Sequence, residues 1–139
     1  MPVFEVHENI EIKRLKYIQL RRSSFFGRLI NYFYFTFAVG IRLREFRKYK
    51  AIIVYSNPPM LPIIAALAKK FFKTKVVFVS YDVYPEIARI TNSASKNSII
   101  TRVMKIINKV VFKRITKVIA LSNEMKEFLF NNRLTLSEK

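Results

Sequence analysis

The fold is decided by the stretch Ala51–Pro59, which reads AIIVYSNPP. Its first five residues are apolar, and a short apolar run that ends at turn residues is typical of a parallel strand buried on both faces. The Ser, Asn and two prolines that follow suit the start of a helix, because Ser and Asn are favoured N-caps and proline fits the first helical turn. The sequence therefore predicts a buried strand at 51–55, a sharp turn and then a helix.

The same order of strand, turn and helix recurs further along the chain. Val76–Val79 and Val118–Leu121 are apolar runs of the same kind, and polar residues follow each of them. Helical patterns cover residues 60–72, 85–90, 98–115 and 124–130. Strands and helices that alternate with short connections predict an α/β fold, namely a Rossmann-like parallel sheet with helices on both faces.

One domain fits a chain of 139 residues. A strand is predicted at Glu11–Leu20, and Ser24 is the expected N-cap of a long amphipathic helix whose last turns are basic. The predicted segments are an N-terminal strand region at 1–24, the amphipathic helix at 25–48, a βαβαβα core at 49–131 and a polar tail at 132–139.

The composition excludes several kinds of site. The chain has no cysteine, which removes disulfide scaffolds, thiolate zinc sites and cysteine nucleophiles. His7 is the only histidine, so a histidine-based metal cluster or a Ser/His/Asp triad is hard to build. We therefore expect neither a metal nor a cofactor.

A membrane-spanning helix is not expected. Acidic residues interrupt the first apolar residues, so no secretory signal is readable there. The uncharged stretch Leu29–Ile41 is too short to span a bilayer, and Ala51–Ala68 contains Pro58, Pro59 and Pro62, which break a continuous helix. Attachment to a membrane surface stays open.

Three polar clusters follow the three predicted strands: Ser56–Pro59, Ser80–Asp82 and Ser122–Glu124. Ligands of open parallel sheets bind outside the carboxyl ends of the strands, where these clusters are expected to converge. Each cluster can also be explained as a helix cap or turn, but their coincidence at one edge favours a binding cleft. Asp82, the only aspartate, could accept a proton from a hydroxyl or hold a sugar hydroxyl.

The chain is strongly basic, with a formal net charge of +17. Arg102, Lys105, Lys109 and Lys113 lie on the predicted helix at 98–115, where the three lysines share one face. The apolar face of that helix is expected to carry Ile99, Val103, Ile106, Val110 and Val111. An anionic membrane attracts such a surface by about 1 kcal/mol per basic residue, and nucleic acid is the rival polyanion.

Residues 49–131 resemble the N-terminal, acceptor-side domain of bacterial GT-B glycosyltransferases of the family-4-like type. The likeness is carried by the strand and Ser-x-Pro-Pro loop at 51–59, by the Asp-Val-Tyr-Pro-Glu motif at 82–86, and by a strand ending at Ser before a helix at 118–127. The resemblance implies that Asp82 and Glu86 line a catalytic cleft. The substrate-binding candidates at its border are Ser56, Asn57, Pro58, Tyr81 and Ser122.

The resemblance implies a retaining transfer of sugar from a nucleotide-sugar to a lipid-linked glycan acceptor, in capsule, exopolysaccharide or O-antigen synthesis. It places the protein at the cytoplasmic face of the cell membrane, where the basic helix would contact anionic lipid. The chain departs from the family pattern at Asn123, where many relatives have Glu, and has only Gly27 and Gly40, neither after a predicted strand. The two glycines predict no phosphate cradle, and the family pattern has a first strand and a second Rossmann domain that this sequence does not show. We therefore expect an incomplete half of a GT-B fold, with one apolar sheet edge exposed and no activity alone.

Two readings without catalysis compete with this one. A basic nucleic-acid-binding domain is compatible with the charge, although the chain has no helix-turn-helix pattern, aromatic RNA-binding signature or zinc ligands. A peripheral membrane adaptor is the other alternative. Binding to lipid vesicles and to DNA would separate the first reading from the nucleic-acid one.

Overall fold

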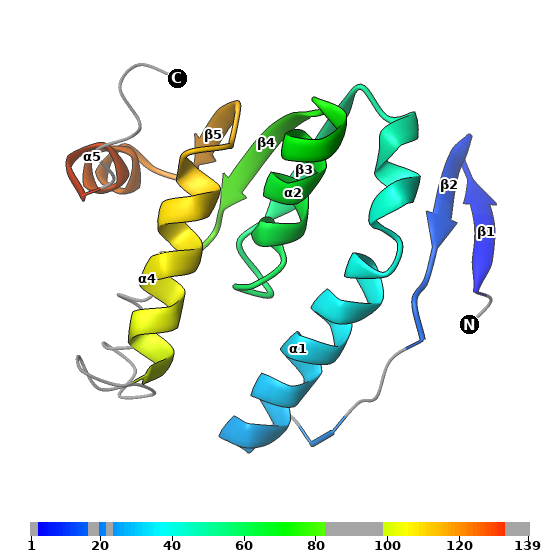
Figure 1. Cartoon of the computed structure of the whole chain (residues 1–139), viewed down its shortest axis with the longest axis horizontal. Helices are drawn as coiled ribbons and strands as arrows, with labels where there is room; N and C mark the ends of the chain where they lie inside the picture. The colour runs from blue at the N-terminus through cyan, green and yellow to red at the C-terminus, as the bar shows by residue number, and fades with distance from the viewer. Residues whose placement is uncertain (1–2, 17–19, 22–23, 83–98, 133–139) are drawn as a thin grey trace.

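The computed structural model describes residues 3–16, 20–21, 24–82 and 99–132 (Figure 1). The helix predicted at 85–90, including Glu86, lies outside the described residues, and so does all but the first residue of the predicted tail.

The centre of the molecule is a three-stranded parallel sheet in the order β3-β4-β5. Its strands are β3 (Ala51–Tyr55), β4 (Lys75–Ser80) and β5 (Lys117–Ala120). Helix α2 (Pro62–Phe72) follows β3 along the chain. Helix α4 (Ile99–Phe112) precedes β5, and α5 (Asn123–Asn132) follows it. The prediction of an α/β, Rossmann-like fold with a parallel sheet flanked by helices is confirmed.

The hydrophobic core lies between one face of this sheet and the helices. Alternate residues of the strands point to it, and they meet side chains of α2, α4 and α5 because each helix turns one apolar stripe inward. The rings of Phe78 and Phe112 pack edge to face with their centroids 5.6 Å apart. The cluster consists of Val54, Ala65, Ala66, Val76, Phe78, Val111, Phe112, Ile115 and Leu129.

The two outer strands are less buried than expected. Ile53 is 63% exposed and Ile119 is 48% exposed, whereas Val76 and Val79 of the central strand are buried. The prediction that the runs at 51–55 and 118–121 are buried on both faces is therefore wrong. An apolar sequence marks a strand, but its cover depends on its place in the sheet, and β3 and β5 each have only one described neighbour.

The N-terminal region is a β-hairpin and not the single strand predicted at Glu11–Leu20. Strands β1 (Phe4–His7) and β2 (Ile10–Lys13) pair in antiparallel fashion. The two residues between them, Glu8 and Asn9, have φ angles of 47° and 63°. Positive φ angles at both central residues are typical of a tight two-residue hairpin turn. Glu rarely adopts a positive φ angle, so the sequence did not indicate a turn at Glu8 and Asn9.

The long helix predicted at 25–48 is two elements. Helix α1 (Phe25–Gly40) ends at Gly40, and the 3-10 helix η1 (Leu43–Lys48) follows. A Cβ on Gly40 would lie 3.4 Å from Ile64 Cδ1, at the limit of ordinary van der Waals contact, so α1 passes close to α2 at this end. Ser24 occupies the N-cap position as predicted, although its side chain makes no capping hydrogen bond.

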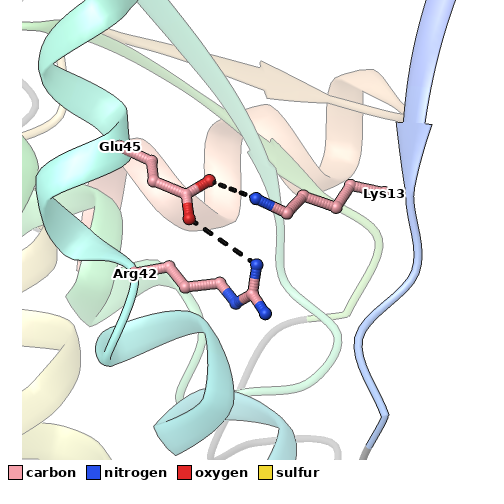
Figure 2. Close-up of polar contacts among 3 residues, drawn as sticks. All are labelled: Lys13, Arg42 and Glu45. Atoms are coloured by element: carbon pink, nitrogen blue, oxygen red, sulfur yellow. Dashed lines mark hydrogen bonds and ion pairs between the residues drawn. The ribbon is translucent and has the colours of Figure 1, made fainter. Parts of the chain in front are cut away.

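An ion-pair cluster joins the hairpin to η1 (Figure 2). Lys13 Nζ donates to Glu45 Oε2 at 2.7 Å, and Arg42 Nη1 lies 3.6 Å from Glu45 Oε1. The hydrogen bond from Lys13 is the main reason why the pKa of Glu45 is lowered, and the positive charges of Lys13, Arg42 and Lys48 act in the same direction. Two cations from separate elements thus share one carboxylate.

We expect this cluster to hold the hairpin less tightly at acid pH, because protonation of Glu45 removes the charge that Lys13 and Arg42 contact. A carboxylate whose pKa is lower in the folded state stabilises that state above its unfolded pKa, and the contribution is lost as pH falls through the folded pKa. We expect the Glu45 carboxyl signal in a ¹³C NMR titration to have a lower midpoint than in the Lys13→Gln variant. Arg42→Gln should raise the midpoint less, because the hydrogen bond from Lys13 is the larger cause. A midpoint that Lys13→Gln leaves in place would contradict this account.

Candidate active-site rim

The carboxyl ends of the three strands lie at one edge of the sheet, here called the rim. The parallel register pairs Tyr55 with Val79 and Ser80 with Ala120, so the loops that follow the strands leave from the same edge. The convergence on which the site prediction depends is therefore present for the ends of β3, β4 and β5.

The first two loops are tied together by one buried hydroxyl. Ser56 is 3% exposed, and its Oγ accepts hydrogen bonds from the backbone amides of both Tyr81 and Asp82, each at 3.0 Å. The backbone amide of Ser56 in turn donates to the carbonyl of Val79 at 3.0 Å and extends the ladder by one residue. Ser56, a predicted substrate-binding residue, thus positions the backbone of Asp82. We call its two hydrogen bonds to Tyr81 and Asp82 the Ser56 clasp.

Asp82 lies half-buried directly beyond this clasp. The hydroxyl of Ser80, itself buried at the end of β4, donates to the Asp82 carbonyl at 3.4 Å, so Asp82 is held both by its own strand end and by the loop after β3. The backbone that carries the Asp82 carboxylate is therefore fixed. A carboxylate can accept hydrogen bonds from sugar hydroxyls or act as a base toward one.

Two aromatic rings stand beside the clasp. Tyr55 and Tyr81 stack with their centroids 5.5 Å apart and their planes at 29°. Both side chains are about half exposed, so the pair presents a ring face to solvent at the rim. Tyr55 precedes Ser56 and Tyr81 precedes Asp82, so the strand ends bring the rings together.

Two hollows adjoin the rim. The smaller, of about 20 Å³, is lined in part by Ser56, Ser80, Asp82 and Asn108, and it is the size of a single water site. The larger, of about 480 Å³, lies between α1 and the loop after β3 and falls within the size range of small-molecule sites. Its lining residues are Arg28, Asn31, Tyr32, Phe35, Tyr55, Asn57, Pro58 and Leu61.

The site prediction missed the contribution of α1. Arg28, Tyr32 and Phe35 are spaced by four and three residues and therefore lie on one face of that helix. The spacing alone indicates that these residues share a helix face. The element that this face contacts depends on tertiary packing, which the spacing does not reveal. The predicted residues Asn57 and Pro58 line the same hollow from the opposite side.

The third cluster has a structural role. Ser122 Oγ accepts from the Met125 amide at 3.2 Å and caps α5, as predicted. Its hydroxyl also bonds the carboxylate of Glu124, and this is the main reason why the pKa of Glu124 is lowered. Ser122 is exposed at the same edge of the sheet, but it lines neither of the two hollows described above.

The basic face of α4 is exposed, as expected from the sequence. Its side chains Arg102, Lys105, Lys109 and, just beyond the helix, Lys113 all face solvent. The predicted apolar face is wrong in part, because Val103 is 39% and Ile106 is 59% exposed while Met104 and Val111 are buried. Thr101 is buried as well, so the inward face of α4 is not purely apolar, and Val103 and Ile106 form an exposed apolar strip beside the lysines.

In the described ranges, no helix is long and apolar enough to cross a membrane, and no three His, Cys, Asp or Glu side chains are grouped to hold a metal ion. Comparison of the chain with protein-family models, curated proteins and solved structures finds no match.

Proposed function

We propose that this chain is the acceptor-side domain of a glycosyltransferase. It would hold a lipid-linked glycan acceptor while a sugar is moved to it from a nucleotide-sugar, in capsule, exopolysaccharide or O-antigen synthesis. The observation that carries the proposal is the Ser56 clasp, because it ties the backbone of Asp82, at the carboxyl edge of a parallel sheet, to the loop after β3. Asp82 lines the smaller hollow, and that loop lines the larger one with Asn57 and Pro58. The motif resemblance at residues 51–59 and 82–86 supplies the reaction.

The rim offers three kinds of group that a sugar needs. The Asp82 carboxylate accepts hydrogen bonds from hydroxyls, and in the transfer it would accept the proton of the attacking hydroxyl or orient that hydroxyl. The stacked rings of Tyr55 and Tyr81 offer an apolar face to the C–H side of a sugar ring. Asn57 and Arg28 add an amide and a guanidinium to the recess.

The donor nucleotide would be held by a second domain. Both glycines of the chain, Gly27 and Gly40, lie in α1, so no loop after a strand has the glycines of a phosphate cradle. The resemblance assigns nucleotide binding to a second Rossmann domain, and the nucleotide and sugar specificity would reside there. We therefore expect no sugar transfer by this chain alone.

The outer surface of α4 supports attachment to the inner face of the cell membrane. Lys105 and Lys109 are exposed next to the apolar strip of Val103 and Ile106. A helix that lies in the bilayer interface combines apolar residues with basic residues that reach the headgroups. The arrangement suits an anionic membrane better than a purely basic face would.

Replacement of Asp82 by Asn is the direct test of the rim. We expect methyl glycosides or bacterial oligosaccharides, titrated into ¹⁵N-labelled protein, to shift the amide signals of Tyr81 and Asp82. Asp82→Asn should weaken that binding about tenfold, because a hydrogen bond to a charged group is replaced by one to a neutral group. The control is Asn131→Asp, which changes an exposed side chain in the last turn of α5 and should leave the affinity unchanged.

A second titration addresses the rival reading. The net charge of +17 also suits nucleic acid, so a DNA shift assay at several salt concentrations is run beside sedimentation with vesicles of anionic and neutral lipid. Binding to anionic vesicles with glycan shifts at the rim supports the proposal. Tight DNA binding with no glycan shift and no vesicle binding would replace it with a nucleic-acid-binding function.

A further inference from the structure

A second large hollow, of about 550 Å³, lies between the hairpin, α1 and η1, and it shares only Phe35 with the hollow beside the rim. It is lined by Lys13, Arg14, Leu15, Phe35, Val39, Arg42, Glu45, Phe46 and Tyr49. Tyr49 and η1 come before β3, whereas the rim residues come after it, so this hollow lies toward the amino end of that strand. In Figure 1 the hairpin stands on the far side of α1 from α4 and α5.

The wall of the hollow is apolar. Leu15, Phe35, Val39 and Phe46 are all half-buried, so each keeps part of its apolar surface open to the cavity or to solvent. Tyr49 is mostly exposed at its border. Ligand sites are typically lined by apolar and aromatic side chains, with a few polar groups that fix the orientation of the ligand.

The polar groups of the hollow are mainly cationic. Lys13, Arg14 and Arg42 line it against the single carboxylate of Glu45. Figure 2 shows Lys13, from the hairpin, and Arg42, from the turn before η1, directed at that one carboxylate. Arg14 is paired with Glu5. Two cations from different elements of the hollow therefore converge on one oxyanion, the Glu45 carboxylate.

We propose that this hollow binds an anionic amphiphile. Its phosphate or carboxylate head would take the place of Glu45 between Lys13 and Arg42, since both cations can donate to an oxyanion. Its alkyl chain would lie along Leu15, Phe35, Val39 and Phe46, where burial of each methylene contributes about 0.8 kcal/mol. This site is distinct from the rim, so the inference does not depend on the proposed transferase function.

The test uses octyl phosphate as the probe, titrated calorimetrically into the whole chain below its critical micelle concentration. Inorganic phosphate represents the head alone, and octyltrimethylammonium represents the same chain with the opposite charge. We expect octyl phosphate to bind at least about tenfold more tightly than either, because it uses both the cations and the apolar wall. Equal binding of inorganic phosphate or of octyltrimethylammonium would overturn the proposal.

Three variants test the two sides of the ion-pair cluster, and removal of a cation should have the opposite effect to removal of the carboxylate. Arg42→Gln should weaken octyl phosphate binding about tenfold, because one charged donor is lost, and Lys13→Gln on the other element should do the same. Glu45→Gln should tighten it by up to about fivefold, because the exposed ion pairs with which the ligand competes are removed. If Glu45 served only to dock the hairpin, Glu45→Gln would loosen the hollow and weaken binding, which is the opposite result.

The matched control is Arg44→Gln. Arg44 is exposed in η1, two residues from Arg42, and does not line the hollow. Its replacement changes the net charge of the chain by the same amount, so it should leave the affinity unchanged. An equal loss in Arg44→Gln and Arg42→Gln would mean that octyl phosphate follows the overall positive charge, and the site would be rejected.

Discussion

Replacing Phe112 with Ala is expected to lower the free energy of unfolding by about 4 kcal/mol. Phe112 is 4% exposed, and its ring packs edge to face against Phe78 in the centre of the core. The lost ring removes both its own transfer free energy and the contacts of the residues around it. Since small domains are stable by about 5–15 kcal/mol, one substitution would remove a large part of the total.

Urea denaturation followed by circular dichroism measures this effect. Phe130→Ala is the matched control, because Phe130 of α5 is 56% exposed and its loss should change stability by no more than about 0.5 kcal/mol. If Phe112→Ala does not fold, Phe112→Leu should still show a loss of about 1.5 kcal/mol, because it retains most of the volume. Equal effects at positions 112 and 130 would mean that the core is not where the structure places it.

The strands of the sheet were predictable because each is a short apolar run that stops at turn residues. The predicted strands at 51–55, 76–79 and 118–121 agree with β3, β4 and β5 to within one residue at each end. Their different burial was not predictable. It depends on the order β3-β4-β5, which only the pairing of strands distant in the sequence decides.

The N-terminal third was predicted less well because its local signals are weak. The hairpin turn uses Glu8 and Asn9, without the glycine that usually marks such a turn. The end of α1 at Gly40 carried a signal, since glycine is a poor helix former, but the apolar spacing continued beyond it to Phe46. The apolar spacing therefore did not reveal that α1 ends at Gly40, where it passes close to Ile64 of α2.

The candidate site was likewise predictable in part from the sequence. Parallel strands must end at one edge, so the meeting of the loops that contain Ser56 and Asp82 could be derived from the order of elements alone. The clasp itself could not, because a hydrogen bond from residues 81 and 82 to residue 56 depends on the strand register. The face of α1 at Arg28 and Tyr32 was missed for the same reason.

Replacing Ser56 with Ala is expected to lower stability by about 2 kcal/mol and to loosen the rim in particular. One hydroxyl accepts from two backbone amides, so its removal leaves the N–H groups of Tyr81 and Asp82 without this acceptor. Unpaired buried donors lose roughly 1–3 kcal/mol each, and the partly exposed position of Tyr81 lets water recover part of it. The loss should therefore exceed that of a single hydrogen bond.

Hydrogen exchange locates the effect, because the amides of Tyr81 and Asp82 should exchange much faster in Ser56→Ala while those of Val76 and Phe78 change only with global stability. The matched control is Ser122→Ala, the same substitution at the end of β5. It removes an exposed helix cap and should reduce stability by only about 1 kcal/mol, with no effect on the Tyr81 and Asp82 amides. If both variants had the same small effect, Ser56 would be an ordinary cap, and the two hydrogen bonds from Ser56 would not be what holds the Asp82 backbone in place for a substrate.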